Sequence, residues 1–174
     1  ISASQSAGIA IIHQELNLIS DLSITENLFL GNEISNVWGI LDKTKMQQLC
    51  LDQLQKVGLA VSPKTKIKDL KIGEQQLVEI TKALLFDAHI IFMDEPTSAL
   101  SNKEVEKLHE IINELRKQGK IIVYISHKMD ELFAIADRYE VLRDGVSIGS
   151  GEMSEITESE LIKMMAGREA VSRI

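Results

Sequence analysis

The stretch from His89 to Ser101 reads HIIFMDEPTSALS, and it decides the fold class because an apolar run ends there in two adjacent carboxylates. Residues 90–93 are apolar without alternation, which is typical of a parallel-sheet strand covered on both faces. Asp94 and Glu95 then follow at the carboxyl end of the strand, the edge where open α/β sheets bind ligands. Two acids at that edge are well placed to handle a metal ion and a water molecule.

The residues alone leave two interpretations of these acids open. An Asp-Glu pair after a strand most often caps the following helix, and a ligand site is the rarer outcome. Here the next helix has a cap of its own, because Ser101 and Glu104 stand at the spacing of a capping box. The sequence therefore favours another use for Asp94 and Glu95.

Two more short apolar runs also end in polar side chains. Residues 8–12 and 121–125 are strand candidates of the same buried type; Gln14 follows the first, and Ser126 and His127 follow the second. Because the carboxyl ends of parallel strands share one edge, we expect these side chains to join the two acids there. Taken singly, such a Gln is usually a loop residue, and such a His is usually structural or solvated.

The spacing of apolar residues predicts helices and one hairpin in the rest of the chain. The predicted helices cover residues 44–57, 70–86, 103–118, 129–137 and 157–165, and the hairpin covers residues 139–150. Capping boxes are expected for the first helix (Thr44 with Gln47) and the last (Thr157 with Glu160). The sequence thus predicts an α/β fold with a mainly parallel sheet and a helical subdomain over about residues 21–85.

Several side chains of the helical part are expected to be buried. The core face predicted for the helix over residues 70–86 consists of Leu77, Ile80, Leu84 and Leu85. Met46 and Cys50 are expected to fill the core rather than to carry chemistry. Phe29 and Trp38 are expected to be buried anchors, although both could instead line an apolar groove for a partner helix.

Gly73 stands at the start of the predicted helix over residues 70–86, which indicates a close backbone approach. The first N–H groups of a helix are unpaired and its N-terminal end is positive, so that end favours a phosphate group. A single glycine at a helix start is weak evidence by itself, but it precedes the strand that ends in Asp94 and Glu95.

Composition excludes several classes of protein. The formal net charge of −7 argues against a general nucleic-acid-binding surface, which needs clustered Lys and Arg. Cys50 is the single cysteine, so an internal disulfide and a thiolate metal cluster are both excluded, and a reducing compartment is expected. No apolar run approaches the roughly 20 residues of a membrane span, and no signal peptide is evident at the beginning of the sequence.

Taken together, the motifs resemble those of ATP-binding-cassette (ABC) ATPases. The run DEPTSAL from Asp94 is similar to the Walker B segment and D-loop, and residues 13–31 are similar to the Q-loop region of ribose-type monosaccharide importers. His127 resembles the switch histidine. The stretch beginning at Leu70 resembles the signature motif, which usually reads LSGGQ, but Lys71, Ile72 and Glu74 depart from that pattern.

The resemblance implies a set of roles. Asp94 and Gln14 would hold Mg²⁺, Glu95 would orient the attacking water, and His127 would contact the γ-phosphate of ATP. The signature stretch would contact the γ-phosphate of ATP held by a second cassette, and Ser98 in the D-loop would take part in nucleotide binding. The residues expected there are Lys71, Ile72, Gly73, Glu74 and Ser98.

The resemblance also implies the setting of the protein. The region from Gln14 to Gly31 would contact membrane permease subunits on the cytoplasmic face of the bacterial inner membrane. A periplasmic sugar-binding protein would be an indirect partner, and a second cassette, fused or dimeric, would complete the ATP sites. No nucleic-acid partner is expected.

The sequence lacks the phosphate-binding P-loop, whose pattern is GxxxxGK followed by Ser or Thr. Its only Gly-Lys pair, Gly119-Lys120, is followed by Ile121. The family places the P-loop upstream of the Q-loop, so we expect residues 1–174 to be a partial ABC ATPase domain whose N-terminal part is missing, with residues 86–174 as its core. The alternatives are a cassette of DNA repair or chromosome organisation, and a catalytically silent interaction module.

Overall fold

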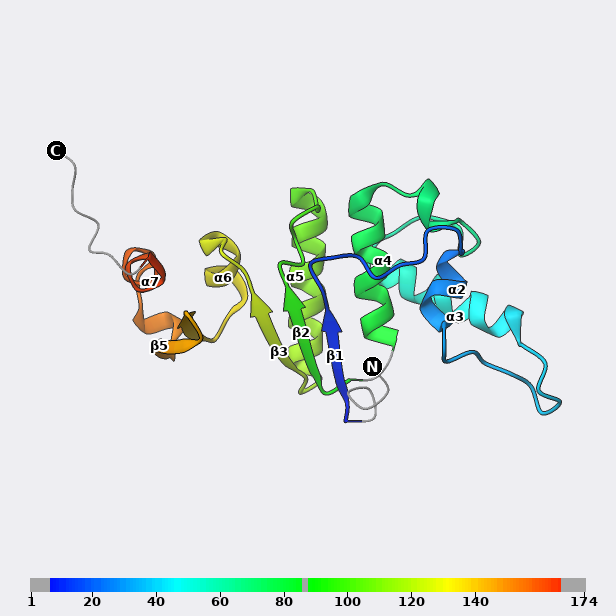
Figure 1. Cartoon of the computed structure of the whole chain (residues 1–174), viewed down its shortest axis with the longest axis horizontal. Coiled ribbons are helices and arrows are strands. Elements are labelled where there is room, and N and C mark those ends of the chain that lie inside the picture. Colours follow the sequence, from blue (N-terminus) through cyan, green and yellow to red (C-terminus); the bar gives the residue numbers. More distant parts are fainter. Residues whose placement is uncertain (1–6, 86–87, 167–174) are drawn as a thin grey trace. The chain divides into compact units, whose positions relative to one another are not determined.

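The computed structural model describes residues 7–85 and 88–166, which divide into two compact units at Ile125 and Ser126 (Figure 1). The first unit holds the predicted sheet and most of the helices, and the second holds a hairpin with two short helices. None of the helices within the described residues is long and apolar enough to cross a membrane.

The first unit is built on a parallel sheet of three strands in the order β1-β2-β3. The strands are β1 (Ile9–Ile12), β2 (Ile90–Asp94) and β3 (Ile121–Ile125). Ile12 pairs with Met93, and Met93 pairs with Tyr124. The three predicted strands and their parallel arrangement are therefore confirmed, and all three carboxyl ends lie at one edge.

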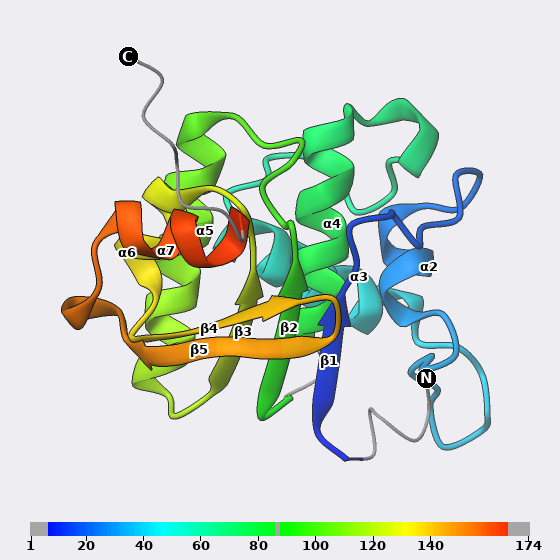
Figure 2. The same ribbon diagram turned by 60° about the vertical axis from the view of Figure 1, so that its left-hand side comes forward.

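The two faces of this sheet differ in burial. Ile12, Ile91 and Met93 lie on the face that the helices cover, and all three are at most 2% exposed. The prediction that the strands are covered on both faces is wrong for β1 and β3, because Ile11 is 46% exposed and Ile121 is 59% exposed. The reason is that α4 contacts β1 and α5 contacts β3 from the same side of the sheet, behind the strands in Figure 2.

Four helices and a 3-10 turn complete the first unit. They are α2 (Ile24–Phe29), α3 (Lys43–Lys56), η1 (Ile67–Asp69), α4 (Ile72–Leu85) and α5 (Asn102–Lys117). Phe86, the predicted end of α4, lies outside the described residues. Contacts of α4 with α2, α3 and β1 make it the centre of the helical part.

Helix α4 is buried more completely than its apolar pattern predicts. Every residue from Gln76 to Thr81 is buried, including Gln76 and Glu79, so this stretch is enclosed on all sides. Leu77 and Ile80 are buried as predicted, whereas Leu84 and Leu85 are only half-buried. Their exposure reflects position, because the neighbouring elements surround the middle of the helix rather than its end.

The helix caps test the local predictions. The Ser101 hydroxyl and backbone N–H both donate to the Glu104 carboxylate, at 2.6 and 2.7 Å, so the predicted capping box of α5 is confirmed. The box predicted from Thr44 is wrong, because α3 begins at Lys43. The Asp42 carboxylate accepts from the Lys45 N–H at 3.0 Å, and this cap places the helix start ahead of Thr44.

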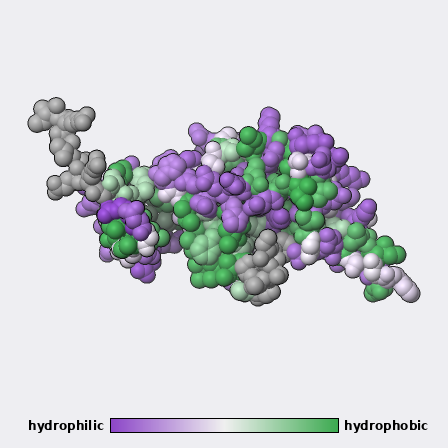
Figure 3. All heavy atoms as spheres, in the orientation of Figure 1, coloured by the Kyte–Doolittle hydropathy of each residue, from purple (hydrophilic) through white to green (hydrophobic). Residues whose placement is uncertain are grey.

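Residues 34–41 form a loop between α2 and α3 that is closed on itself. The Asn36 side-chain oxygen accepts from the N–H groups of Trp38 and Ile40, at 2.9 and 3.0 Å. Trp38 is 83% exposed and Val37 is 95% exposed, so the prediction that Trp38 is a buried anchor is wrong. The loop projects to the right of the first unit in Figure 1, and Figure 3 shows green, apolar surface near this tip. Phe29 is 4% exposed, as predicted.

The second unit contains the predicted hairpin. Its elements are α6 (Met129–Ile135), β4 (Arg138–Arg143), β5 (Val146–Glu152), η2 (Met153–Glu155) and α7 (Glu158–Ala166). Asp144 and Gly145 turn the hairpin with positive φ angles of 50° and 77°, which suits the type I′ turn expected of an Asp-Gly pair. Helix α6 ends at Ile135, earlier than the predicted Asp137. The Thr157 and Glu160 capping box of α7 is confirmed.

Candidate site at the carboxyl edge of the sheet

The register of β1 and β2 brings three of the predicted site residues to one edge. Asp94 is the last residue of β2, and Glu95 follows it directly. Because Ile12 pairs with Met93, the chain leaves β1 at the same level, and Gln14 stands two residues beyond that pair, as Glu95 does. Gln14 is exposed and both acids are half-buried, so their side chains are accessible to a ligand.

Glu95 has a backbone conformation that is rare for its residue type. Its φ angle is +47°, in the left-handed region where a side chain is unfavourable for any residue but glycine. The Glu95 N–H donates to the Ile125 carbonyl of β3 at 2.9 Å, and the Glu95 carbonyl accepts from the Ser98 N–H at 3.2 Å. These bonds hold the strained turn in place. Such strain is concentrated at functional sites, and the sequence pattern gave no sign of it.

The segment after Glu95 packs closely against the start of α4. A Cβ on Gly73 would lie 2.9 Å from the Ala99 carbonyl oxygen and 3.5 Å from the Glu104 carboxylate. The predicted close approach at Gly73 is therefore present, and the group that approaches belongs to the same chain. Ser98 is exposed at this position, beside a buried Thr97.

The first turn of α4 carries its own negative charge. The Glu74 carboxylate accepts from the Lys71 N–H at 2.8 Å, which satisfies one of the N–H groups at this helix end. Ile72 is 65% exposed and the Lys71 side chain is exposed. Hydrogen bonds from Ser101 mainly lower the pKa of Glu104, and the Lys71 ammonium lowers it further. Lys71 therefore lies within electrostatic range of the α5 cap.

His127 belongs to the second unit and stands two residues after the end of β3. Its side chain is exposed. The next residue, Lys128, forms an ion pair with Glu131 at 3.1 Å, and the Glu131 side chain is only 6% exposed. His127 is therefore an exposed residue just ahead of α6. Its contact with the γ-phosphate stays a prediction.

The donor atoms at the edge suit magnesium. Asp94 offers carboxylate oxygens and Gln14 offers an amide oxygen, and Mg²⁺ in nucleotide sites takes one or two such protein oxygens besides phosphate and water. Among the described residues, no three His, Cys, Asp or Glu side chains cluster as a complete metal cage. Asp94 and Gln14 would supply part of the coordination of such an ion, and phosphate oxygens and water would supply the rest.

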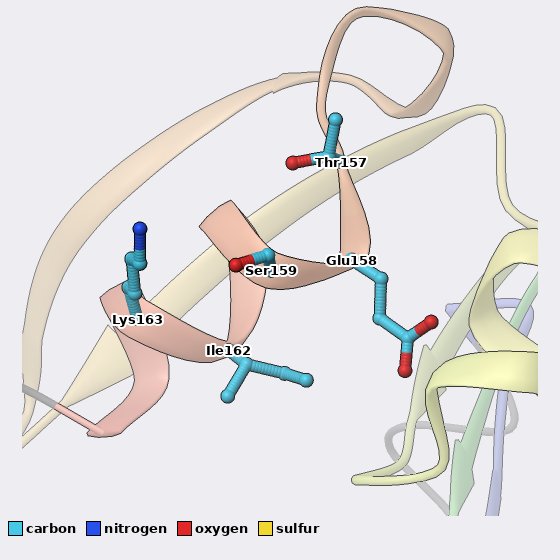
Figure 4. A pocket seen from close by; sticks show the side chains of 5 residues that line it. All are labelled: Thr157, Glu158, Ser159, Ile162 and Lys163. Carbon is cyan, nitrogen blue, oxygen red and sulfur yellow. The ribbon is translucent and has the colours of Figure 1, made fainter. Parts of the chain in front are cut away.

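A depression on the second unit is a different kind of feature. It is lined by Thr157, which directly precedes α7, and by Glu158, Ser159, Ile162 and Lys163 of α7 (Figure 4). Figure 4 shows the side chains of one short helical stretch around an open surface. None of the predicted site residues lines this depression.

Comparisons with known proteins identify a family. The family described as ABC transporter matches residues 1–98. The chain is 50% identical over 162 residues to the ribose import ATP-binding protein of Caldanaerobacter subterraneus, which covers 93% of the chain and 33% of that protein. It is 52% identical over 169 residues to the xylose import ATP-binding protein of Moorella thermoacetica, covering 97% of the chain and 33% of that protein.

A solved structure supports the fold. A dimeric ATP-binding cassette in a post-hydrolysis state, bound to ADP and Pi, is similar with a TM-score of 0.75 and 24% identity, covering 87% of this chain and 66% of that one. The chain spans about a third of the length of the two curated import proteins.

Proposed function

This chain belongs to the ABC transporter family, and we propose that it forms part of the ATP-hydrolysing, energy-coupling subunit of a bacterial monosaccharide importer. The observation that carries the proposal is the convergence of Gln14, Asp94 and Glu95 at one edge of a parallel sheet. The similar proteins named for the import of ribose and of xylose support a sugar as the transported substrate.

In this proposal the residues at the edge bind the metal ion and activate the water. Asp94 and Gln14 offer oxygen atoms to Mg²⁺, which would neutralise charge on the phosphates of bound ATP. Glu95 is proposed to accept a proton from, or to orient, the attacking water. Its backbone forms a left-handed turn, and its N–H donates to the Ile125 carbonyl. His127 is proposed to contact the γ-phosphate.

The start of α4 is proposed to face the ATP of a second cassette. This surface has two small residues, Gly73 and the exposed Ser98. It also has two longer exposed side chains, those of Lys71 and Ile72. Glu74 adds a negative charge at the same helix end, which opposes a phosphate. We therefore propose that the contact depends on the backbone of Gly73, and that the long, exposed Lys71 side chain turns out to solvent.

The remaining partners follow from the same reading. The exposed part of the region from Gln14 to Gly31 is proposed to contact permease subunits at the cytoplasmic face of the inner membrane, with a periplasmic sugar-binding protein acting through the permease. The P-loop pattern does not occur in the 174 residues. Tight ATP binding is therefore proposed to depend on a phosphate cradle outside them.

Reconstitution of the complete importer in liposomes tests this proposal. ATP turnover should require Mg²⁺ and should rise when the sugar-binding protein is loaded with ribose or xylose. Stimulation by DNA in place of loaded binding protein would favour the alternative of a cassette that acts on chromosomes. Absence of nucleotide binding by the complete protein would contradict an ATPase and would favour a silent interaction module.

A further inference from the structure

Helix α4 carries two buried polar side chains that its role as a packing helix does not explain. Gln76 is 2% exposed and Glu79 is 6% exposed. The Gln76 Nε2 and the Glu79 Oε2 are buried without a hydrogen-bond partner among the described residues. By contrast, the Thr81 hydroxyl in the same helix donates to the Leu77 carbonyl at 2.6 Å. Buried polar groups without partners are rare in folded proteins and are unfavourable for stability, so they call for a functional explanation.

The surroundings of Glu79 connect α4 to the segment that carries Gln14. Burial is the main influence on the Glu79 carboxylate, and it raises the pKa. The charges of Lys82 and His13, and a hydrogen bond with the Asn17 backbone, act in the opposite direction. His13 and Asn17 lie on either side of Gln14 in the chain, and α4 contacts β1, from which this segment emerges.

The far end of the same segment is held by a fully satisfied side chain. Asn27 of α2 is 1% exposed, accepts from the Ile19 N–H at 2.7 Å, and donates to the Ile19 carbonyl at 3.0 Å. The backbone is thus fixed at Ile19 by an amide. Nearer to Gln14, the Glu79 carboxylate of α4 is hydrogen-bonded to the backbone of Asn17.

A neutral side chain of similar size would fill this space without burying a charge. Burying a carboxylate is unfavourable unless an opposite charge or a hydrogen-bond donor interacts with it. It attracts His13, a group that is exposed and stands next to Gln14. The burial of Glu79 is therefore better explained by control of this segment than by packing.

We propose that Glu79 is a positioning residue for Gln14: its carboxylate holds the backbone at Asn17 and attracts His13, so that the segment between them is fixed relative to α4. Because α4 begins at Ile72 and Gly73, this link also ties the surface facing a second cassette to the Gln14 side of the site. The importance of Gln14 rests on the proposed function, but the link itself does not.

Hydrogen–deuterium exchange on the complete protein tests the link without any measurement of ATPase activity. Glu79→Leu removes the acceptor of the Asn17 N–H and keeps a similar volume, so exchange of the Asn17 amide, followed in peptides that cover residues 13–17, should accelerate by at least about 10-fold, with α5 unchanged. Glu79→Gln keeps an acceptor oxygen and should accelerate exchange much less. Glu15→Gln, an exposed carboxylate next to Gln14, is the matched control and should have no effect. Unchanged exchange over residues 13–17 in folded Glu79→Leu would overturn the proposal.

A double-mutant cycle keeps the proposal testable if Glu79→Leu does not fold. His13→Ala changes an exposed side chain, and its effect on exchange over residues 13–17 should be smaller in a Glu79→Gln background than in the original protein. Equal effects in both backgrounds would overturn the proposed attraction between Glu79 and His13.

ATP turnover provides the functional arm. Glu79→Leu should lower kcat about 10-fold or more with less than a roughly 2-fold change in the KM for ATP, since misplacement affects the reacting geometry. Altered exchange in a protein without any ATPase activity would support the link and contradict the proposed function. Altered exchange with unchanged kcat in an active protein would overturn the assignment of Glu79 as a positioning residue for catalysis.

Discussion

Replacement of Glu95 by glycine and, separately, by alanine measures the backbone strain at the end of β2. The φ angle of +47° disfavours every residue with a Cβ, by about 1–2 kcal/mol for the left-handed conformation. Glycine adopts this angle freely, but it loses about 0.5–1 kcal/mol relative to alanine because its unfolded chain has more freedom. The two effects oppose each other, and the strain is the larger. We therefore expect the Glu95→Gly chain to be more stable than Glu95→Ala by about 0.5–1 kcal/mol.

Ser98 is the matched control position. It is exposed, lies in the same turn, and is not among the residues with a positive φ. There the usual order should hold, with Ser98→Gly less stable than Ser98→Ala by about 0.4–1 kcal/mol. The order of the glycine and alanine variants should thus invert between two positions that are three residues apart.

Urea denaturation followed by far-UV circular dichroism measures these differences. Circular dichroism is preferred to fluorescence because Trp38 is the only tryptophan and is 83% exposed, so its emission changes little on unfolding. An alanine variant at Glu95 that is as stable as the glycine variant, or more stable, would refute the claim that the turn is strained.

Three further predictions concern local structure. Hydrogen bonds from Ser101 lower the pKa of Glu104 in the folded protein. The pair therefore contributes stability above the ordinary glutamate pKa of about 4.3, and this stability is lost as the pH falls through the lowered pKa. Glu104→Gln should flatten that acid limb of the stability curve, which urea titrations at several pH values would measure. Trp38 should emit as a water-exposed indole, and Trp38→Ala should change the unfolding free energy by no more than about 0.5 kcal/mol; a blue-shifted emission would contradict the exposed loop. Gly73→Ala should destabilise the chain by about 1–3 kcal/mol, because the new Cβ would meet a backbone oxygen at 2.9 Å, whereas Lys71→Ala at the same helix end should have little effect in the same denaturation assay.

The sequence predicted the sheet because its evidence is local and continuous. Each of the three strands is a run of apolar residues, and each run ends in the polar groups that the structure places at the strand ends. The capping boxes at Ser101 and Thr157 were predictable for the same reason, since their hydrogen bonds span three residues. Patterns over a few neighbouring residues were therefore enough to predict that Asp94 and Glu95 lie at the carboxyl edge of the sheet.

Features that depend on distant neighbours were not predictable. The exposure of Trp38 follows from a loop that closes on Asn36, and a tryptophan in a sequence does not reveal what surrounds it. Gln76 and Glu79 were missed as buried residues because an amphipathic pattern assumes one solvated face, whereas α4 is enclosed by α2, α3 and β1. The positive φ at Glu95 arises from a hydrogen bond with β3, about thirty residues later in the chain.

The most direct test of the proposed ATPase site is ATP binding and turnover by the complete protein with Glu95→Gln, and with Glu106→Gln, at an exposed carboxylate of α5 that has no role in the proposed site, as a matched control. The amide keeps the shape of the Glu95 side chain but is a much weaker base, so turnover should fall by about 100-fold or more. ATP affinity should be nearly unchanged, and Glu106→Gln should hydrolyse ATP at the original rate. Hydrolysis by Glu95→Gln at the original rate would contradict the assignment of Glu95 as the residue that activates water.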